Sequence, residues 1–203
     1  MEQCRVAEEV GFEICWVNDH QTTEGTNYWP SPLTRLTSIA VGTESLELVT
    51  FVLILPMYHP LHVAQRAAIL DNISDRRLTL GVGLGYVEKE FDTFNVPMDE
   101  RAGRVIEGIQ FIAEFFESDK PITYECPFFE VKDCQSLPKT IQEPQPSLWI
   151  GGWGDKQIAR SVTFSDAWVP GVVAGLEAVK VRKEKQRKYV AETIRTGARW
   201  TTR

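Results

Sequence analysis

Short apolar segments alternate with amphipathic segments along most of this chain of 203 residues. Each apolar segment stops at Gly, Pro, Asn or Asp, and the residues after it repeat their apolar positions every three or four residues, as a helix does. Five such cycles predict a parallel sheet with right-handed crossovers, either open or closed into a barrel. Ligands of such folds bind at the carboxyl ends of the strands. The expected strands are residues 14–17, 46–55, 78–85, 148–150 and 167–169.

Capping residues and helical periodicity predict the segments between these strands. We expect a helix before Gly11 and a helical tail after Pro170. Four further helices are expected between them: one starts at Pro60, and the other three are capped by Ser31, Asp99 and Asp155. Between Pro121 and Pro146 the pattern changes to short runs with scattered prolines. We therefore expect one domain, residues 1–203, with a hairpin-like insertion at about 121–146.

Composition narrows the function classes. The net charge is −6, so no global basic field exists for nucleic acid or an anionic membrane. The basic run over 180–188 is expected to be a solvated helix face, and the apolar stretch 46–57 is too short to cross a bilayer. Four cysteines without a C-x-x-C pair, and the absence of a leader-like start, predict reduced thiols and a cytoplasmic location.

Three alternating glycines, Gly81, Gly83 and Gly85, end the third expected strand. The dinucleotide fingerprint G-x-G-x-x-G does not fit, because Tyr86 stands where its last glycine should be and no clean helical period follows. A buried parallel strand whose carboxyl end opens onto a ligand fits better.

The candidate functional residues follow the ends of the expected strands. Asp19 and His20 follow the first strand, where a histidine can act as acid or base or donate to a flavin-like ring. The alternative is a loop histidine whose partner is Asp19. Glu88 and Glu90 lie just past the glycine strand, and although they could act as acid or base, carboxylates on an open loop are more often solvated. Tyr86 could contact a cofactor from the same rim, and Arg101 and Arg104 are expected to pair with those carboxylates.

Gly151, Gly152 and Gly154 lie between a strand and a helix. Backbone amides at such a helix start can hold a phosphate, and a tight turn is the alternative. His59 and His62 lack a third ligand at metal-binding spacing, so no metal is expected. The sequence contains no G-x-S-x-G elbow and no P-loop lysine, so the commonest classes of hydrolase and NTPase are excluded.

Several segments together resemble one family, the luciferase-like monooxygenases, which include flavin-dependent monooxygenases and coenzyme F420-dependent oxidoreductases. No single segment is specific, but their order and spacing between Val6 and Pro170 are. The segments are Ala-Glu-Glu-Val-Gly-Phe at 7–12, Trp-Val-Asn-Asp-His at 16–20, Leu-Pro-Met-Tyr-His-Pro at 55–60, 70–78, 81–86 with Glu90-Phe91, 96–101, Trp-Ile-Gly-Gly at 149–152 and Asp-Ala-Trp at 166–168.

The resemblance implies a (β/α)8 barrel, or TIM barrel, that binds reduced coenzyme F420 or FMN across its strand ends and acts on a small-molecule substrate as an oxidoreductase or monooxygenase. The barrel is expected to be incomplete here, lacking strand 1 and strands 7 and 8. The implied catalytic residues are Asp19 and His20. The implied cofactor-binding residues are His20, Leu55, Gly83, Gly85, Tyr86, Gly151, Gly152 and Gly154.

The Asp19-His20 pair resembles the F420 branch slightly more than the Glu-His-His of FMN enzymes. Tyr86 departs from that branch's sugar-phosphate dehydrogenases, which carry a glutamate there. The alternatives are a non-catalytic flavin-binding or structural remnant of the same fold, and a different phosphate-binding barrel. A homodimer is one candidate assembly, and the sequence does not determine the oligomeric state. Gly152→Asp is expected to abolish cofactor binding and leave the fold intact.

Overall fold

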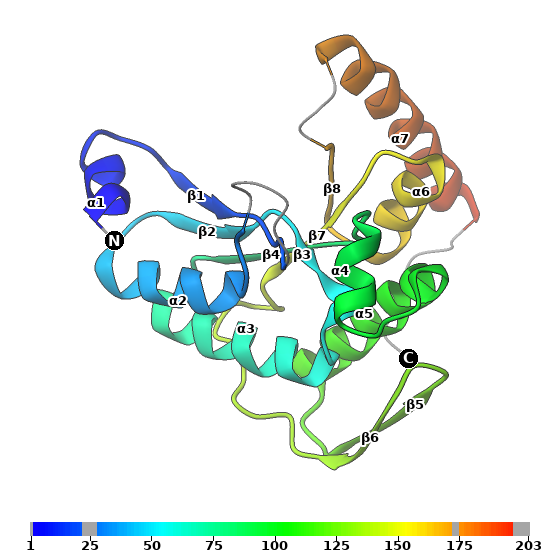
Figure 1. Ribbon diagram of the computed structural model, residues 1–203, viewed down its shortest axis with the longest axis horizontal. Coiled ribbons are helices and arrows are strands. Elements are labelled where there is room, and N and C mark those ends of the chain that lie inside the picture. The colour runs from blue at the N-terminus through cyan, green and yellow to red at the C-terminus, as the bar shows by residue number, and fades with distance from the viewer. Residues whose placement is uncertain (1, 22–27, 172–174, 197–203) are drawn as a thin grey trace.

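The computed structural model describes residues 2–21, 28–171 and 175–196. A central parallel sheet has the strand order β1-β2-β4-β7-β8, with the short β3 paired to β4 (Figure 1). The sheet strands are β1 (Ile14–Val17), β2 (Glu47–Thr50), β3 (Leu53–Ile54), β4 (Leu78–Gly83), β7 (Ser147–Gly151) and β8 (Ala167–Val169). All five predicted strands are therefore confirmed, and one of them is divided.

The division falls inside the predicted strand 46–55, between β2 and β3. The Thr50 hydroxyl accepts a hydrogen bond from the Gly81 amide (2.8 Å) and donates one to the Gly81 carbonyl (2.7 Å). A side chain thus takes the place of backbone pairing at this point. Phe51 and Val52, joined by a cis peptide bond, separate the two strands, and β3 then pairs with the end of β4.

Helices cover one face of the sheet. Figure 1 shows α2, α3 and α5 side by side along that face, while α6 and α7 pack together beside β7 and β8. Phe111, Phe115 and Ile109 of α5 are fully buried in this core. The helices are α1 (Glu2–Glu9), α2 (Pro32–Gly42), α3 (Pro60–Ser74), α4 (Glu88–Thr93), α5 (Arg101–Glu117), α6 (Asp155–Phe164) and α7 (Leu176–Thr196).

Of the three predicted caps, one is confirmed and two are wrong. Ser31 is the N-cap residue of α2, although its backbone is left-handed (φ 56°) and its side chain makes no capping hydrogen bond. Asp99 lies inside a 3-10 turn, Met98–Glu100, and Glu100 takes the cap position of α5. Asp155 is the first residue of α6 rather than its cap, and its carboxylate pairs with Lys185 of α7 (2.6 Å).

An antiparallel hairpin lies inside the segment 121–146, where a hairpin-like insertion was expected. It consists of β5 (Ile122–Cys126) and β6 (Phe129–Cys134). The rings of Tyr124 and Phe129 stack on each other (5.4 Å) and both meet Phe111 of α5 edge-on. Aromatic packing thus fastens the hairpin to the helical layer.

The sheet is open within the described residues, because β1 pairs only with β2 and β8 only with β7. Ile14 and Trp16, alternate residues of β1, are 48% and 55% exposed. The architecture described is therefore an α/β parallel sheet with two open edges. None of the described helices is long and apolar enough to cross a membrane.

Candidate functional site

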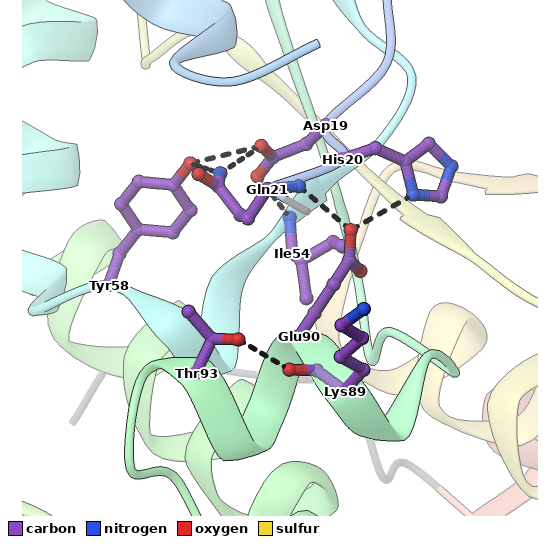
Figure 2. A network of polar contacts seen from close by, with 8 residues as sticks. All are labelled: Asp19, His20, Gln21, Ile54, Tyr58, Lys89, Glu90 and Thr93. Atoms are coloured by element: carbon purple, nitrogen blue, oxygen red, sulfur yellow. Dashed lines mark hydrogen bonds and ion pairs between the residues drawn. The ribbon is translucent and has the colours of Figure 1, made fainter. Parts of the chain in front are cut away.

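Asp19 lies just past the end of β1 and connects it to β3. The side chain is 2% exposed. Its Oδ2 accepts a hydrogen bond from the Ile54 amide (3.0 Å), and its Oδ1 accepts one from the Tyr58 hydroxyl (3.1 Å) and one from the Gln21 side-chain amide (Figure 2). Gln21 also donates to the Tyr58 hydroxyl (2.6 Å). Asp19 therefore fixes the carboxyl ends of two strands relative to each other.

The surroundings of Asp19 disfavour its charge. Burial raises the pKa of the Asp19 carboxyl to about 6, with a smaller contribution from the negative charge of Glu90, while the three hydrogen bonds lower it. Burial and the neighbouring Asp19 carboxylate also raise the pKa of the Tyr58 hydroxyl. Both groups bear protons more readily than they would in water, as acid–base groups at functional sites often do.

His20 turns away from Asp19 and toward Glu90. Its Nδ1 lies 3.3 Å from Oε1 of Glu90, and the same oxygen accepts a hydrogen bond from the Gln21 amide (2.8 Å). The Glu90 side chain is 1% exposed and that of His20 is 20% exposed. The interpretation of His20 as a loop histidine paired with Asp19 is therefore wrong.

Glu90 is the residue of this network whose position the sequence pattern did not predict. It was expected to be solvated on an open loop, whereas it is buried on α4, whose six residues are too few to show a helical period. The segment Glu90-Phe91 of the family resemblance was the available signal, and both side chains are buried. Glu88, on the same short helix, is exposed as expected.

The expected pairing of Arg101 and Arg104 with these two carboxylates is also wrong. Arg104 forms an ion pair with Glu100 one helical turn earlier (2.8 Å), and Arg101 donates a hydrogen bond to the Met98 carbonyl (2.6 Å). Both contacts stay within the start of α5 and fix its approach to the preceding 3-10 turn.

The glycines at the strand ends leave room for a side chain of the protein itself. A Cβ at Gly83 would lie 2.6 Å from Val52, and one at Gly151 would lie 2.9 Å from it. Val52 therefore packs against the ends of both β4 and β7.

Gly85, Tyr86 and Leu55 occupy three different environments. Gly85 has φ +74°, and a Cβ there would collide with Ile54 and Phe91. The next residue, Tyr86, is 76% exposed and its ring meets that of His20 edge-on at 6.1 Å. The structure thus places Tyr86 beside His20, whereas the side chain of Leu55 is buried.

The turn from β7 to α6 contains Gly151, Gly152 and Gly154. The Gly152 amide donates to the Val169 carbonyl (3.0 Å), so it pairs with β8. Gly152 has φ +141°, and a Cβ there would lie 3.0 Å from Gln157, so Gly152→Asp would disturb the turn itself and is not the clean test expected. A Cβ at Gly154 would meet nothing within 4 Å. The open space before α6 lies at Gly154.

His59 and His62 lie away from this network. The Nδ1 of His59 accepts a hydrogen bond from the Leu61 amide at the start of α3 (3.3 Å), and its ring meets Phe129 edge-on. Burial lowers the pKa of His59, assisted by the charge of His62. Within the described ranges no group of three or more His, Cys, Asp or Glu residues could hold a metal ion.

The fold and the site together define a class of α/β protein. In this class, polar side chains and an uncrowded helix N-terminus lie at the carboxyl edge of a parallel sheet. The sequence profile described as luciferase-like monooxygenase matches residues 1–202. The chain belongs to this family, as the resemblance predicted.

A relative named as flavin-dependent and a relative named as F420-dependent are both similar to this chain. It is 29% identical to the oxygenase component of flavin-dependent trigonelline monooxygenase from Acinetobacter baylyi, over 74% of this chain and 41% of that protein. It is also 29% identical to F420-dependent glucose-6-phosphate dehydrogenase from Amycolatopsis mediterranei, over 86% of this chain and 58% of that protein.

A solved structure is also similar to this chain over most of its length. The crystal structure of the monooxygenase RslO1 from Streptomyces bottropensis superposes with a TM-score of 0.85 and 26% identity, over 98% of this chain and 61% of that one. The chain therefore spans 41–61% of the length of these three proteins.

Proposed function

We propose that this chain is part of an oxidoreductase that binds reduced FMN or coenzyme F420 and acts on a small organic substrate, by hydride transfer or by activation of oxygen. The observation that supports this most is His20, held by the buried Glu90 at the carboxyl edge of the sheet. The flavin-dependent and F420-dependent relatives support a flavin and F420 equally. When bound, the cofactor would supply the redox chemistry, while the protein would orient it and exclude water.

The residues present fit the phosphate end of such a cofactor. The amides of Gln157 and Ile158 donate to the Gly154 carbonyl, so the two amides before them precede the first helical hydrogen bonds of α6, and the space at Gly154 is open. The carboxylate of Asp155, which would repel an anion there, is neutralised by Lys185. Favourable charge and open space thus coincide at this helix start.

The residues at the neighbouring strand ends fit the ring end of the cofactor. His20 and Tyr86 lie next to each other on an exposed rim, and Val52 lies against the glycines of β4 and β7. In the proposed complex the ring lies among these side chains. His20 then contacts the ring or the substrate, and Asp19 holds the strand ends that form this rim.

The complete molecule in this proposal is a closed (β/α)8 barrel of which these residues form one part. The open edges of the sheet and the exposed side chains of Ile14 and Trp16 support this, because further strands would cover them. The same open edges favour a second candidate, a remnant of the fold that binds a flavin without turnover or only serves a structural role.

Cofactor titration tests the proposal and identifies the cofactor. The 203-residue chain is titrated with FMN and, separately, with F420, and cofactor fluorescence is followed. Gly154→Asp is expected to weaken binding at least tenfold, because it places a carboxylate where the phosphate would lie, whereas Gly154→Ala retains it.

Each result is decisive for this chain when circular dichroism shows that the samples are folded. Saturable binding that Gly154→Asp alone weakens supports the proposed site. Binding that the variant leaves unchanged removes the start of α6 from the site. A folded chain that binds neither cofactor contradicts the proposal.

A further inference from the structure

Glu90 offers one buried oxygen to two neighbours. Its Oε1 accepts the Gln21 amide proton at 2.8 Å and lies 3.3 Å from Nδ1 of His20. The carboxylate comes from α4, whereas both neighbours follow β1, 69 and 70 residues away in the sequence. Their meeting is a product of the fold and not of local sequence.

We propose that Glu90 is a positioning residue that fixes the tautomer of His20, so that neutral His20 carries its proton on Nδ1 and presents Nε2 as a hydrogen-bond acceptor. A carboxylate only accepts hydrogen bonds, and a neutral imidazole has a single N–H. Because the site is buried, it would be costly for an unprotonated Nδ1 to face the carboxylate oxygen Oε1. The proton therefore lies between Nδ1 and Oε1.

The neighbouring groups agree with this assignment. Asp19, adjacent in sequence, directs both oxygens to Ile54, Tyr58 and Gln21 and so does not orient the His20 ring. Tyr86 meets the ring edge-on. Figure 2 shows Nδ1 of His20 directed at Glu90, with Asp19 directed to the opposite side.

This inference rests on the proposed function in one respect, that Nε2 of His20 faces the cofactor or its substrate. An accepting Nε2 suits a residue that takes a proton from the substrate or accepts a hydrogen bond from a reduced ring. The competing explanation is structural, with Glu90 merely fastening α4 to the segment after β1 through the Gln21 amide.

The position of the ring proton separates these explanations without any cofactor. The chain has three histidines, so long-range ¹H–¹⁵N spectra of the ¹⁵N-labelled protein give three ring patterns, and His20→Gln identifies that of His20. The expected neutral ring is protonated at Nδ1. Glu90→Met removes the acceptor and is expected to lower the ratio of Nδ1–H to Nε2–H forms about tenfold.

Two controls complete the test. Glu90→Gln keeps an accepting oxygen and is expected to retain the Nδ1–H form. Glu88→Met, an exposed change on the same helix, is expected to leave the spectrum of His20 unchanged.

An Nε2–H form of His20 in the wild-type chain would falsify the proposal. This measurement needs no variant, so it tests the proposal even if Glu90→Met does not fold. An unchanged His20 pattern in folded Glu90→Met would also overturn it. Loss of cofactor binding with the tautomer as expected would instead contradict only the proposed function.

Discussion

Asp19 shows how a single buried residue makes the stability of this protein depend on pH. Three donors hold its carboxyl group, yet burial disfavours its charge more than these hydrogen bonds favour it, and the pKa is raised from 3.8 to about 6. A carboxyl whose folded pKa is raised contributes stability that is fully present below its unfolded pKa. That contribution is lost as the pH rises through the folded pKa.

Asp19→Asn is therefore expected to become relatively more favourable as the pH rises. The amide stays neutral, and the Gln21 amide and the Tyr58 hydroxyl can turn to match it. The free energy of unfolding of the variant, relative to wild type, should rise by about 2–3 kcal/mol between pH 4 and pH 7.5. Urea denaturation at both pH values measures this difference.

The exposed Asp99 provides the control for Asp19. Asp99→Asn removes a carboxyl outside the network, so comparison of the two variants isolates the effect of burial. A difference between Asp19→Asn and wild type that is the same at both pH values would show that Asp19 ionises in the folded protein as it does in the unfolded chain.

At the scale of elements, strands were predictable from the sequence and short-range details were not. Apolar runs bounded by glycine, proline, asparagine or aspartate indicated all five strands, and β4, buried on both faces, is the strand in which such a run is demanded throughout. The cap at Ser31 was predictable, whereas the caps at Asp99 and Asp155 were not, because Asp99 lies in a 3-10 turn and Asp155 pairs with Lys185 of another helix. The partner of His20 could not be predicted from spacing, because Glu90 reaches it only through the fold.

The glycines of β4 provide a test of element packing. A Cβ at Gly81 would lie 2.1 Å from the Thr50 carbonyl oxygen, and the two Thr50–Gly81 side-chain hydrogen bonds hold that backbone in place. Gly81→Ala is therefore expected to destabilise the fold by about 1–3 kcal/mol or more, measured by urea denaturation.

Gly154→Ala is the matched control for Gly81→Ala. Its backbone (φ −71°, ψ 150°) suits any residue and its Cβ meets nothing within 4 Å, so the expected loss is below about 1 kcal/mol. Equal losses from both substitutions would mean that β4 can move away from Thr50, and the close contact would then not determine the residue at position 81.

For the whole molecule, the open edge at β1 is the feature with the largest consequence. Within the described residues β1 pairs on one side only, and it exposes Ile14 and Trp16 on the same face. Exposed apolar edge strands pair with other chains. The 203-residue chain is therefore expected to self-associate as its concentration rises, observable by sedimentation velocity.

Ile14→Lys is expected to reduce this association without loss of the fold, because a charged side chain on an edge strand opposes pairing. Val41→Lys is its control, since Val41 is 75% exposed on α2 and the substitution changes the net charge equally. If both variants reduced association to the same degree, the reduction would not be specific to the edge of β1. If only Ile14→Lys reduced it, the edge of β1 would be the contact surface, where further strands of a closed barrel would otherwise lie.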